Sequence, residues 1–353
     1  MRPMVNVLAR VIATLTTLMV LTTFHGQTIR WLIPSGAISS EGSAVANDGT
    51  SVVIAQFQTY LNSYYTSAGG EGPLQWFGGP ADIRLLSISE ATDAQGRKYV
   101  CGWFPGGDLY GIYKNPLSSL QTSIQGYYFM SISPDAQISV GYGRNGGSVY
   151  WDGQLHSVTV QFARAVDRHP SGTFVIAGRG IQPSWHGGPI ATDREFHCVR
   201  MTGDQSFVAG GQGFISYGTG ANDFVQLPQF GIYTNPVAYS IAVVDNKVIA
   251  VGSAGRRAVR WIYDNQKNLV SFEDLTAVYA NILPTGTVLE TAKCISPNGR
   301  WIIGTGINGS TGRREAFLLD TIGCQLPSDI NGDGVVDDAD LLQVLFDFGR
   351  SCP

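Results

Sequence analysis

One pattern of polar and apolar positions recurs seven times between residues 43 and 304. In each copy a short strand leads into a polar turn of Asp, Asn, Gly or Pro, and an apolar run follows. The copies span 43–55, 87–102, 131–141, 164–178, 198–210, 240–252 and 294–304. We call the last residue of each copy its closing residue. It is Ala55 in the first copy, and in the others it is Gly102, Gly141, Gly178, Gly210, Gly252 and Gly304.

Each copy predicts a β-hairpin, because the turn residues supply the backbone conformations that a tight reversal needs. The apolar runs, such as those at 52–55 and 301–304, are hydrophobic at successive positions. That pattern is typical of an inner strand buried on both faces between neighbouring sheets. A closing glycine lacks a side chain, so it lets backbones approach closely where strands converge.

The segments after each hairpin predict the architecture. A third strand carrying an aromatic residue follows several copies, as at Trp151, Trp261 and Phe317, and a weaker fourth strand leads to the next copy. Four strands in a unit of about 40 residues are the signature of a propeller blade. The sequence therefore predicts an all-β fold, a seven-bladed β-propeller. A twisted sandwich or an open solenoid is the alternative.

The ends of the repeat region predict how the ring closes. The last copy stops after its third strand, at Asp320, and an additional strand at 28–33 precedes the first copy. We expect strand 28–33 to complete the last blade, because that pairing removes exposed sheet edges.

These copies resemble the HAF family of extracellular repeats and, more loosely, the SPDG repeats of TolB-like propellers. The segment SPNGRWIIG at 296–304 carries the second likeness, and 31–53 carries the HAF spacing. The resemblance covers about 28–320. It implies an exported bacterial protein with a propeller fold, and it implies no activity.

The first residues predict export. Arg2 and Arg10 stand before and at the start of an apolar stretch at 11–24, which suits the hydrophobic region of a signal peptide and is short for a membrane span. We assign 1–26 to a signal peptide, with an uncleaved anchor as the alternative, and expect a secreted or cell-surface protein without a membrane span after cleavage.

Nucleic acid is excluded as a partner because the chain has 23 Lys and Arg against 27 Asp and Glu, and so has no excess of positive charge.

The C-terminal segment 323–353 predicts a calcium site. From Pro327 onward it contains six Asp and one Arg, so it carries most of the net charge of −4. Residues 329–340 match the twelve-position calcium loop, with Gly334 at the turn. The predicted Ca²⁺ ligands are Asp329, Asn331, Asp333, Val335 through its backbone carbonyl, Asp337 and Asp340. A short apolar helix is expected to follow, so the C-terminus predicts a small calcium loop–helix module.

This segment resembles one repeat of a type I dockerin, an EF-hand-like unit that also uses Asp at position 12. The resemblance implies a docking element with a cohesin-like or cell-envelope protein as its partner. A dockerin has two packed repeats and this chain has one, and Asp338-Ala339 stands where that family often has Ser-Thr.

The five cysteines divide into two groups. Cys324 and Cys352 bracket the calcium module, and we expect a disulfide between them, because an exported chain permits it. Closing a ring of about 29 residues contributes roughly 3–4 kcal/mol in the chain-entropy model. Cys101, Cys198 and Cys294 stand among apolar residues and are expected to be buried free thiols.

Within the predicted propeller, 27–322, no nucleophile elbow, phosphate loop or zinc pattern occurs. We therefore expect a non-catalytic binding or cell-surface protein. Candidates for stacking on polysaccharide are Tyr60, Tyr64, Tyr65, Tyr127 and Tyr128.

Two alternatives stay open. The first is a carbohydrate-active, polysaccharide-degrading enzyme in which carboxylates pair in space, and its candidate residues are Asp108, Asp152, Asp223 and Glu273. The second is a structural envelope protein whose calcium module is only a cap. The polar and aromatic stretch at 185–188 is interpreted as a loop between blades.

Overall fold

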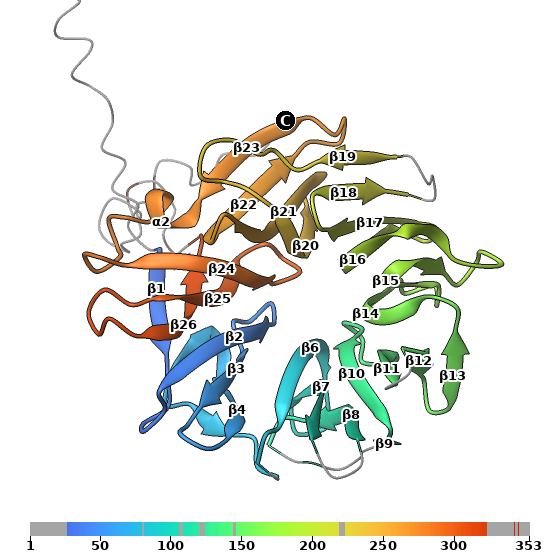
Figure 1. Cartoon of the computed structure of the whole chain (residues 1–353), viewed down its shortest axis with the longest axis horizontal. Helices are drawn as coiled ribbons and strands as arrows, with labels where there is room; N and C mark the ends of the chain where they lie inside the picture. Colours follow the sequence, from blue (N-terminus) through green and yellow to red (C-terminus); the bar gives the residue numbers. More distant parts are fainter. Residues whose placement is uncertain are drawn as a thin grey trace, which may run out of the picture. The chain divides into compact units, whose positions relative to one another are not determined.

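Strands make up nearly all of the regular structure of this protein. The computed structural model describes residues 27–79, 81–105, 109–118, 120, 124–143, 146–218, 223–322, 342 and 345. Thr28–Thr321 forms one compact unit, and Figure 1 shows its sheets arranged in a ring. Within the described residues, no helix has the length and apolar character needed to cross a membrane.

The strands of the ring form six antiparallel sheets. In chain order the first five contain β2 (Ser39–Val45), β3 (Ser51–Gln56), β4 (Leu61–Tyr65) and β5 (Gln75–Trp76); β6 (Arg84–Thr92), β7 (Lys98–Pro105), β8 (Leu109–Pro116) and β9 (Ile124–Gln125); β10 (Tyr127–Ile132), β11 (Ser139–Gly143), β12 (Ser148–Trp151) and β13 (Leu155–Val158); β14 (Gln161–Arg168), β15 (Phe174–Pro183), β16 (Ile190–Gly203), β17 (Ser206–Gly211), β18 (Phe214–Tyr217) and β19 (Phe224–Gln226); and β20 (Val237–Val244), β21 (Lys247–Ala254), β22 (Arg257–Tyr263) and β23 (Leu269–Asp274). The sixth contains β24 (Val288–Ile295), β25 (Trp301–Ile307), β26 (Arg314–Asp320) and β1 (Thr28–Leu32). Two short helical segments, η1 (Ala68–Gly70) and α2 (Leu275–Val278), lie between strands.

The β-propeller prediction is confirmed, but the predicted number of seven separate blades is corrected to six sheets. The repeat copies do form hairpins, from β2–β3 to β24–β25. Two of these hairpins share a sheet because β16 runs without a turn from one to the other. Its first part pairs with β15, where Glu195 faces Arg179, and its second part pairs with β17, where Phe196 faces Gly211. The sequence before Gly203 in this strand has no Gly, Pro or Asn that would break it.

The N-terminal strand pairs with the last sheet, as the sequence predicts. Each residue of β1 faces a residue of β26, from Thr28 opposite Asp320 to Leu32 opposite Ala316. Asp320 is buried and accepts two hydrogen bonds from the Arg300 guanidinium, at 2.9 and 2.7 Å. The pairing with β1 therefore covers the outer edge of β26 and joins the N-terminal strand to the last sheet.

A β-bulge interrupts each inner strand at an equivalent place. The bulged residues lie between the paired residues of the inner strand and its neighbour: Ser43, Leu86, Met130, 162–164, His197, Tyr239 and Lys293. A bulge places two residues opposite one and turns the side chain of the extra residue. We call Ser43, Leu86, Met130, Arg164, His197, Tyr239 and Lys293 the bulge ring.

The closing glycines lie against these bulges, which is the close approach that the sequence predicts for them. A Cβ atom added to Gly252 would overlap the carbonyl oxygen of Val237, and one added to Gly102 would overlap that of Arg84. In the fifth copy Gly211, one residue after the predicted Gly210, takes this place against the carbonyl oxygen of Glu195. The missing side chain therefore makes room for the bulged backbone.

Hydroxyl groups connect neighbouring inner strands around the ring. Ser43 donates to the carbonyl of Leu85 at 2.7 Å, and Ser87 accepts from the amide of Ile132 at 3.2 Å.

The apolar runs fill the space between sheets, where Trp261 and Phe317 are fully buried. Trp261 belongs to a cluster between β16–β18 and β20–β22, in agreement with its predicted packing role. Truncating a buried residue of this size typically costs about 3–5 kcal/mol.

The predicted calcium module and signal peptide lie outside the described residues, except for Leu342 and Leu345. Both leucines are helical and exposed. The signal peptide, the Ca²⁺ ligands and the Cys324–Cys352 disulfide stay predictions.

We predict that Gly252→Ala destabilises the protein, because the added methyl group must displace the backbone of Val237. The expected loss of unfolding free energy is about 2 kcal/mol or more, measured by urea denaturation. Gly188→Ala is the matched control, since a Cβ at Gly188 meets no atom within 4 Å. It should stay within about 0.5 kcal/mol of wild type. Equal midpoints for the two variants would contradict the role assigned to the closing glycine.

Candidate functional site

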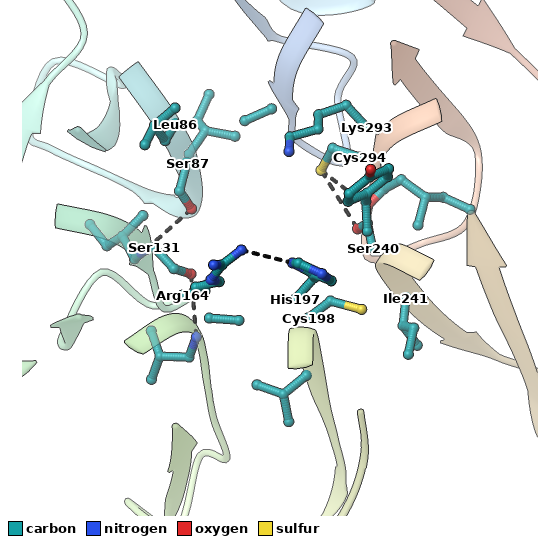
Figure 2. A pocket seen from close by; sticks show the side chains of 18 of the residues that line it. Leu86, Ser87, Ser131, Arg164, His197, Cys198, Ser240, Ile241, Lys293 and Cys294 are labelled. Atoms are coloured by element: carbon teal, nitrogen blue, oxygen red, sulfur yellow. Dashed lines mark hydrogen bonds between the residues drawn. The ribbon is translucent and has the colours of Figure 1, made fainter. Parts of the chain in front are cut away.

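The inner strands surround a central channel, a cavity of about 210 Å³. Every member of the bulge ring lines it, so each of β2, β6, β10, β14, β16, β20 and β24 contributes one side chain. Figure 2 shows the Arg164 guanidinium and the Lys293 amine projecting into this space from opposite strands. The bulges therefore gather side chains that are far apart in the sequence around one cavity.

Arg164 lines one side of the channel and contacts His197 and Glu195. Its Nη1 lies 3.2 Å from Nδ1 of His197, and its Nη2 lies 2.5 Å from Oε1 of Glu195. Since the guanidinium always donates, His197 accepts this hydrogen bond on Nδ1 and is therefore in its neutral form. The Nε of Arg164 is buried and has no hydrogen-bond partner within the described structure.

The pKa of His197 is lowered from 6.5 to about 4. Desolvation by burial is the largest cause, and the positive charges of Arg164 and Lys293 add to it, while Glu195 opposes it. Burial in the channel therefore disfavours the imidazolium, in the direction expected for a cation taken out of water.

Lys293 extends into the channel from β24. Its Nζ lies 4.6 Å from the centre of the Tyr239 ring, which is a cation–π contact. The channel wall desolvates the amine and lowers its pKa, and the charge of Arg164 acts in the same direction. Within the described residues, Lys293 makes no ion pair with a carboxylate.

The channel widens at one end into a hollow of about 610 Å³, which we call the mouth. Four aromatic side chains line it: Trp103, Tyr128, Tyr142 and Tyr239. The ring centres of Trp103 and Tyr128 are 5.0 Å apart, and those of Tyr128 and Tyr142 are 5.7 Å apart. These contacts place three rings in one continuous aromatic wall.

Charged side chains complete the mouth. The Arg84 guanidinium lies 4.9 Å from the centre of the Trp103 ring, and its buried Nε has no hydrogen-bond partner in the described structure. Arg314 bridges two carboxylates, with its Nε 2.9 Å from Glu290 and its Nη1 3.2 Å from Glu41. The mouth thus offers ring faces together with donors and acceptors of hydrogen bonds.

Farther along the inner strands the charges of the channel are paired. The Glu90 carboxylate accepts from the amide of Asn47 at 3.0 Å and lies 3.6 Å from Lys98. Arg200 lies 3.3 Å from buried Asp167. Only the mouth side of the described channel has cations without carboxylate partners, so a ligand for such cations would bind there.

The carboxylates predicted for catalysis are not brought together. Asp152 lies 3.0 Å from His156, Asp223 is paired with Lys267, and Glu273 is paired with Arg260. Asp108 lies outside the described residues. None of the three described carboxylates lines the channel or the mouth.

The predicted tyrosine candidates separate in the structure. Tyr128 lines the mouth, whereas Tyr60 stacks on Phe57 and Tyr65 donates to Gln75 at 2.9 Å. Tyr64 lies in β4, and Tyr127 packs against a buried cluster. The stretch at 185–188 is a loop, but it joins the paired strands β15 and β16 of one sheet and does not lie between blades as predicted; Trp185 packs against a core cluster.

The three cysteines of the described part are free. Cys101 and Cys198 are buried, as predicted, while Cys294 is half-buried beside the channel. Burial raises the pKa of Cys198 to about 12 and raises the pKa of Cys294. Within the described residues, no group of three or more His, Cys, Asp or Glu is placed to hold a metal ion.

The sequence analysis missed Arg84, Arg164, His197 and Lys293. The last three occupy one column of the repeat, at or just before the start of a copy, where the other copies have Ser43, Leu86, Met130 and Tyr239. The only sequence signal for these three residues is their shared place immediately before or at the start of a copy.

Sequence comparison finds no matching protein family and no matching curated protein. Several solved structures are similar in fold. A chain of the Mitotic Checkpoint Complex has a TM-score of 0.53 at 11% identity, covering 83% of this chain and 91% of that chain. The β-propeller domain of Cps50 (Swd1) from Myceliophteria thermophila has a TM-score of 0.52 at 12% identity, covering 82% and 99%.

The WD40 β-propeller domain of Doa1 is similar at a TM-score of 0.45 and 14% identity, covering 83% of this chain and 93% of that chain. At these identities the likeness concerns the fold alone. The chain has a β-propeller fold, with a candidate binding site where the channel opens into the mouth.

We predict that stability falls as the pH decreases from about 6.5 to about 4, in part through His197. Because its folded-state pKa lies below 6.5, the unfolded chain binds a proton in this window that the folded protein excludes. NMR titration of the imidazole should give a pKa near 4, and His197→Asn should flatten the pH dependence of the urea midpoint. A measured pKa at or above 6.5 would contradict the assigned burial.

Proposed function

We propose that this chain is an exported, non-catalytic binding protein. Its propeller binds polysaccharide at the mouth, and its C-terminal segment 323–353 is a calcium-dependent docking element for a cohesin-like or cell-envelope protein. The observation that carries the first part is the aromatic wall of Trp103, Tyr128 and Tyr142. It lines a hollow of about 610 Å³, which is large enough for a sugar ring.

The chemistry of the mouth suits a sugar. Aromatic faces provide apolar contact area for the C–H face of a ring at low entropic cost, because the side chains are already packed against each other. Arg314, Glu41 and Glu290 provide donors and acceptors that hydroxyl groups require. The pocket therefore combines apolar walls with a few polar groups that fix orientation, as ligand sites do.

The placement of carboxylates favours binding over glycoside hydrolysis. Hydrolysis needs two carboxyl groups flanking the bond, one of them free to donate a proton. Glu41, which lines the mouth, shares Arg314 with Glu290, and the three described carboxylates that the sequence suggested for catalysis are paired elsewhere.

Export and docking rest on the sequence. The apolar stretch at 11–24 supports secretion, and secretion supports both a calcium-loaded loop and a Cys324–Cys352 disulfide. The four Asp carboxylates predicted as ligands repel each other, and a bound Ca²⁺ removes this repulsion. The resemblance to HAF repeats and to a dockerin repeat supports the same assignment.

We predict that Trp103→Ala and Tyr128→Ala each weaken polysaccharide binding about tenfold or more, because each removes a stacking surface at the mouth. Affinity electrophoresis against a panel of neutral and acidic polysaccharides measures the effect. Trp76→Ala is the matched control, because Trp76 is exposed on the outer strand β5. Equal retardation of all three variants and wild type would contradict binding at the mouth.

We predict that Asp329→Ala abolishes or strongly weakens Ca²⁺ binding, because it removes the ligand at the first loop position. Isothermal titration calorimetry on the full mature chain should give one site for wild type. Asp338→Ala removes the same charge from a non-ligand position and should keep the site. Absence of heat in wild type at millimolar Ca²⁺ would contradict the metal site, and an unaffected Asp329→Ala would contradict the ligand assignment.

A further inference from the structure

The channel just below the mouth has unmatched positive charge. Of the cations on this side, Arg164 is paired with Glu195, and Arg314 is paired with Glu41 and Glu290. Lys293 and Arg84 have no carboxylate partner in the described part of the chain, and each lies over an aromatic ring instead. The site is therefore short of anionic charge by an amount that a bound ligand could supply.

Hydrogen-bond donors at this place also lack acceptors. The Nε atoms of Arg164 and Arg84 are both buried and have no partner in the described structure. Buried donors are nearly always satisfied, so one unpaired donor at the channel and another at the mouth indicate that a ligand supplies acceptors there. A charged donor that is left unsatisfied is especially costly.

The unmatched groups lie together at the channel entrance. Lys293 lines both the channel and the mouth, Arg164 lines the channel, and Arg84 lines the mouth. Lys293 and Arg164 point into the same space from β24 and β14 (Figure 2). The charge of each also lowers the pKa of His197, so both lie close enough to the imidazole to interact with it electrostatically.

We infer that Lys293, together with the free Nε of Arg164, forms a carboxylate subsite, and that the saccharide bound at the mouth carries a uronate-type acidic sugar. This inference rests on the proposed function and names the class of its ligand. The two oxygens of a carboxylate match the two kinds of donor, an ammonium and a guanidinium N–H. The sugar ring then lies over the aromatic wall, near Arg84.

The carboxylates near the mouth favour a single acidic sugar over a chain with many adjacent negative charges. Glu41 lines the mouth, and Glu195 and Glu290 are bonded to Arg164 and Arg314, which line the channel and the mouth, so a chain with many adjacent negative charges, such as an acidic peptide, meets repulsion near these carboxylates. A carboxylate that is separated from the next by a neutral sugar body reaches Lys293 with less of this repulsion.

Calorimetry with defined oligosaccharides tests the inference on the full mature chain. We expect a galacturonic acid trimer to bind at least about tenfold more tightly than a neutral galactose trimer, since a charge-assisted pair of this kind is worth about that factor. Lys293→Met should remove this preference, measured as the ratio of the affinities for the two trimers. Lys293→Arg should restore part of it.

Lys247→Met is the matched control, because Lys247 is exposed at the start of β21, away from the channel. It should retain the acidic preference. Equal affinity of wild type for the two trimers, or an unchanged preference in Lys293→Met, would overturn the subsite. Tighter binding of a poly-glutamate peptide than of the acidic trimer would overturn the assignment to a sugar.

A second readout separates this inference from the proposed function. The His197 imidazole reports on the channel by NMR, and a carboxylate bound at Lys293 should raise its pKa above the value of about 4 in the free protein. Acetate alone is the probe, and Lys293→Met should remove its effect. If neither trimer binds but acetate shifts His197, polysaccharide binding fails and the carboxylate subsite stands. If both trimers bind equally and acetate has no effect, the subsite fails and saccharide binding stands.

An equal shift of His197 by inorganic phosphate at the same concentration would show a general anion site, and this would overturn the selectivity for carboxylates.

Discussion

The close approach between each closing glycine and the bulge of its inner strand is the constraint on which the channel depends. At Gly252 and Gly102 the neighbouring carbonyl occupies the volume that a side chain would need. Where a glycine faces the bulge, this space accommodates the displaced backbone, whereas in the first hairpin the bulge at Ser43 lies beside Val53. The bulge turns one additional residue in each strand toward the axis, so the repeat produces a ring of side chains around a cavity.

Closure of the ring determines which residues meet at this cavity. The pairing of β1 with β26, and the buried Asp320–Arg300 interaction beside it, hold the last sheet next to the first. The amide and side chain of Asn298 also donate to Asn47, at 2.7 and 3.1 Å, and join the turns of these two sheets. Arg314 in the last sheet can therefore bond Glu41 in the first, and the mouth includes both ends of the repeat region.

Local sequence was sufficient to predict much of the fold. The hairpins follow from turn residues and apolar runs, and the pairing of β1 follows from an incomplete last unit that needs a fourth strand. The number of sheets did not follow, because β16 continues without a turn through Phe196 and pairs with both β15 and β17, which joins two of the predicted units in one sheet. Strand pairing on both sides of one segment depends on its neighbours in space, and a local pattern does not contain that information.

The candidate site was less predictable than the fold. Tyr128 was recognised as a stacking candidate, but Lys293, Arg164 and His197 are separated by up to about a third of the chain and belong to no motif. Only the ring geometry makes them neighbours. The sequence by itself determined the repeating hairpins and the strand that closes the ring, because both depend on short-range hydrophobic patterning and turn chemistry. The tertiary structure alone decided the sheet count, the shared environment of the bulge ring and the unmatched charge at the mouth, because these depend on distances between strands that lie far apart in sequence.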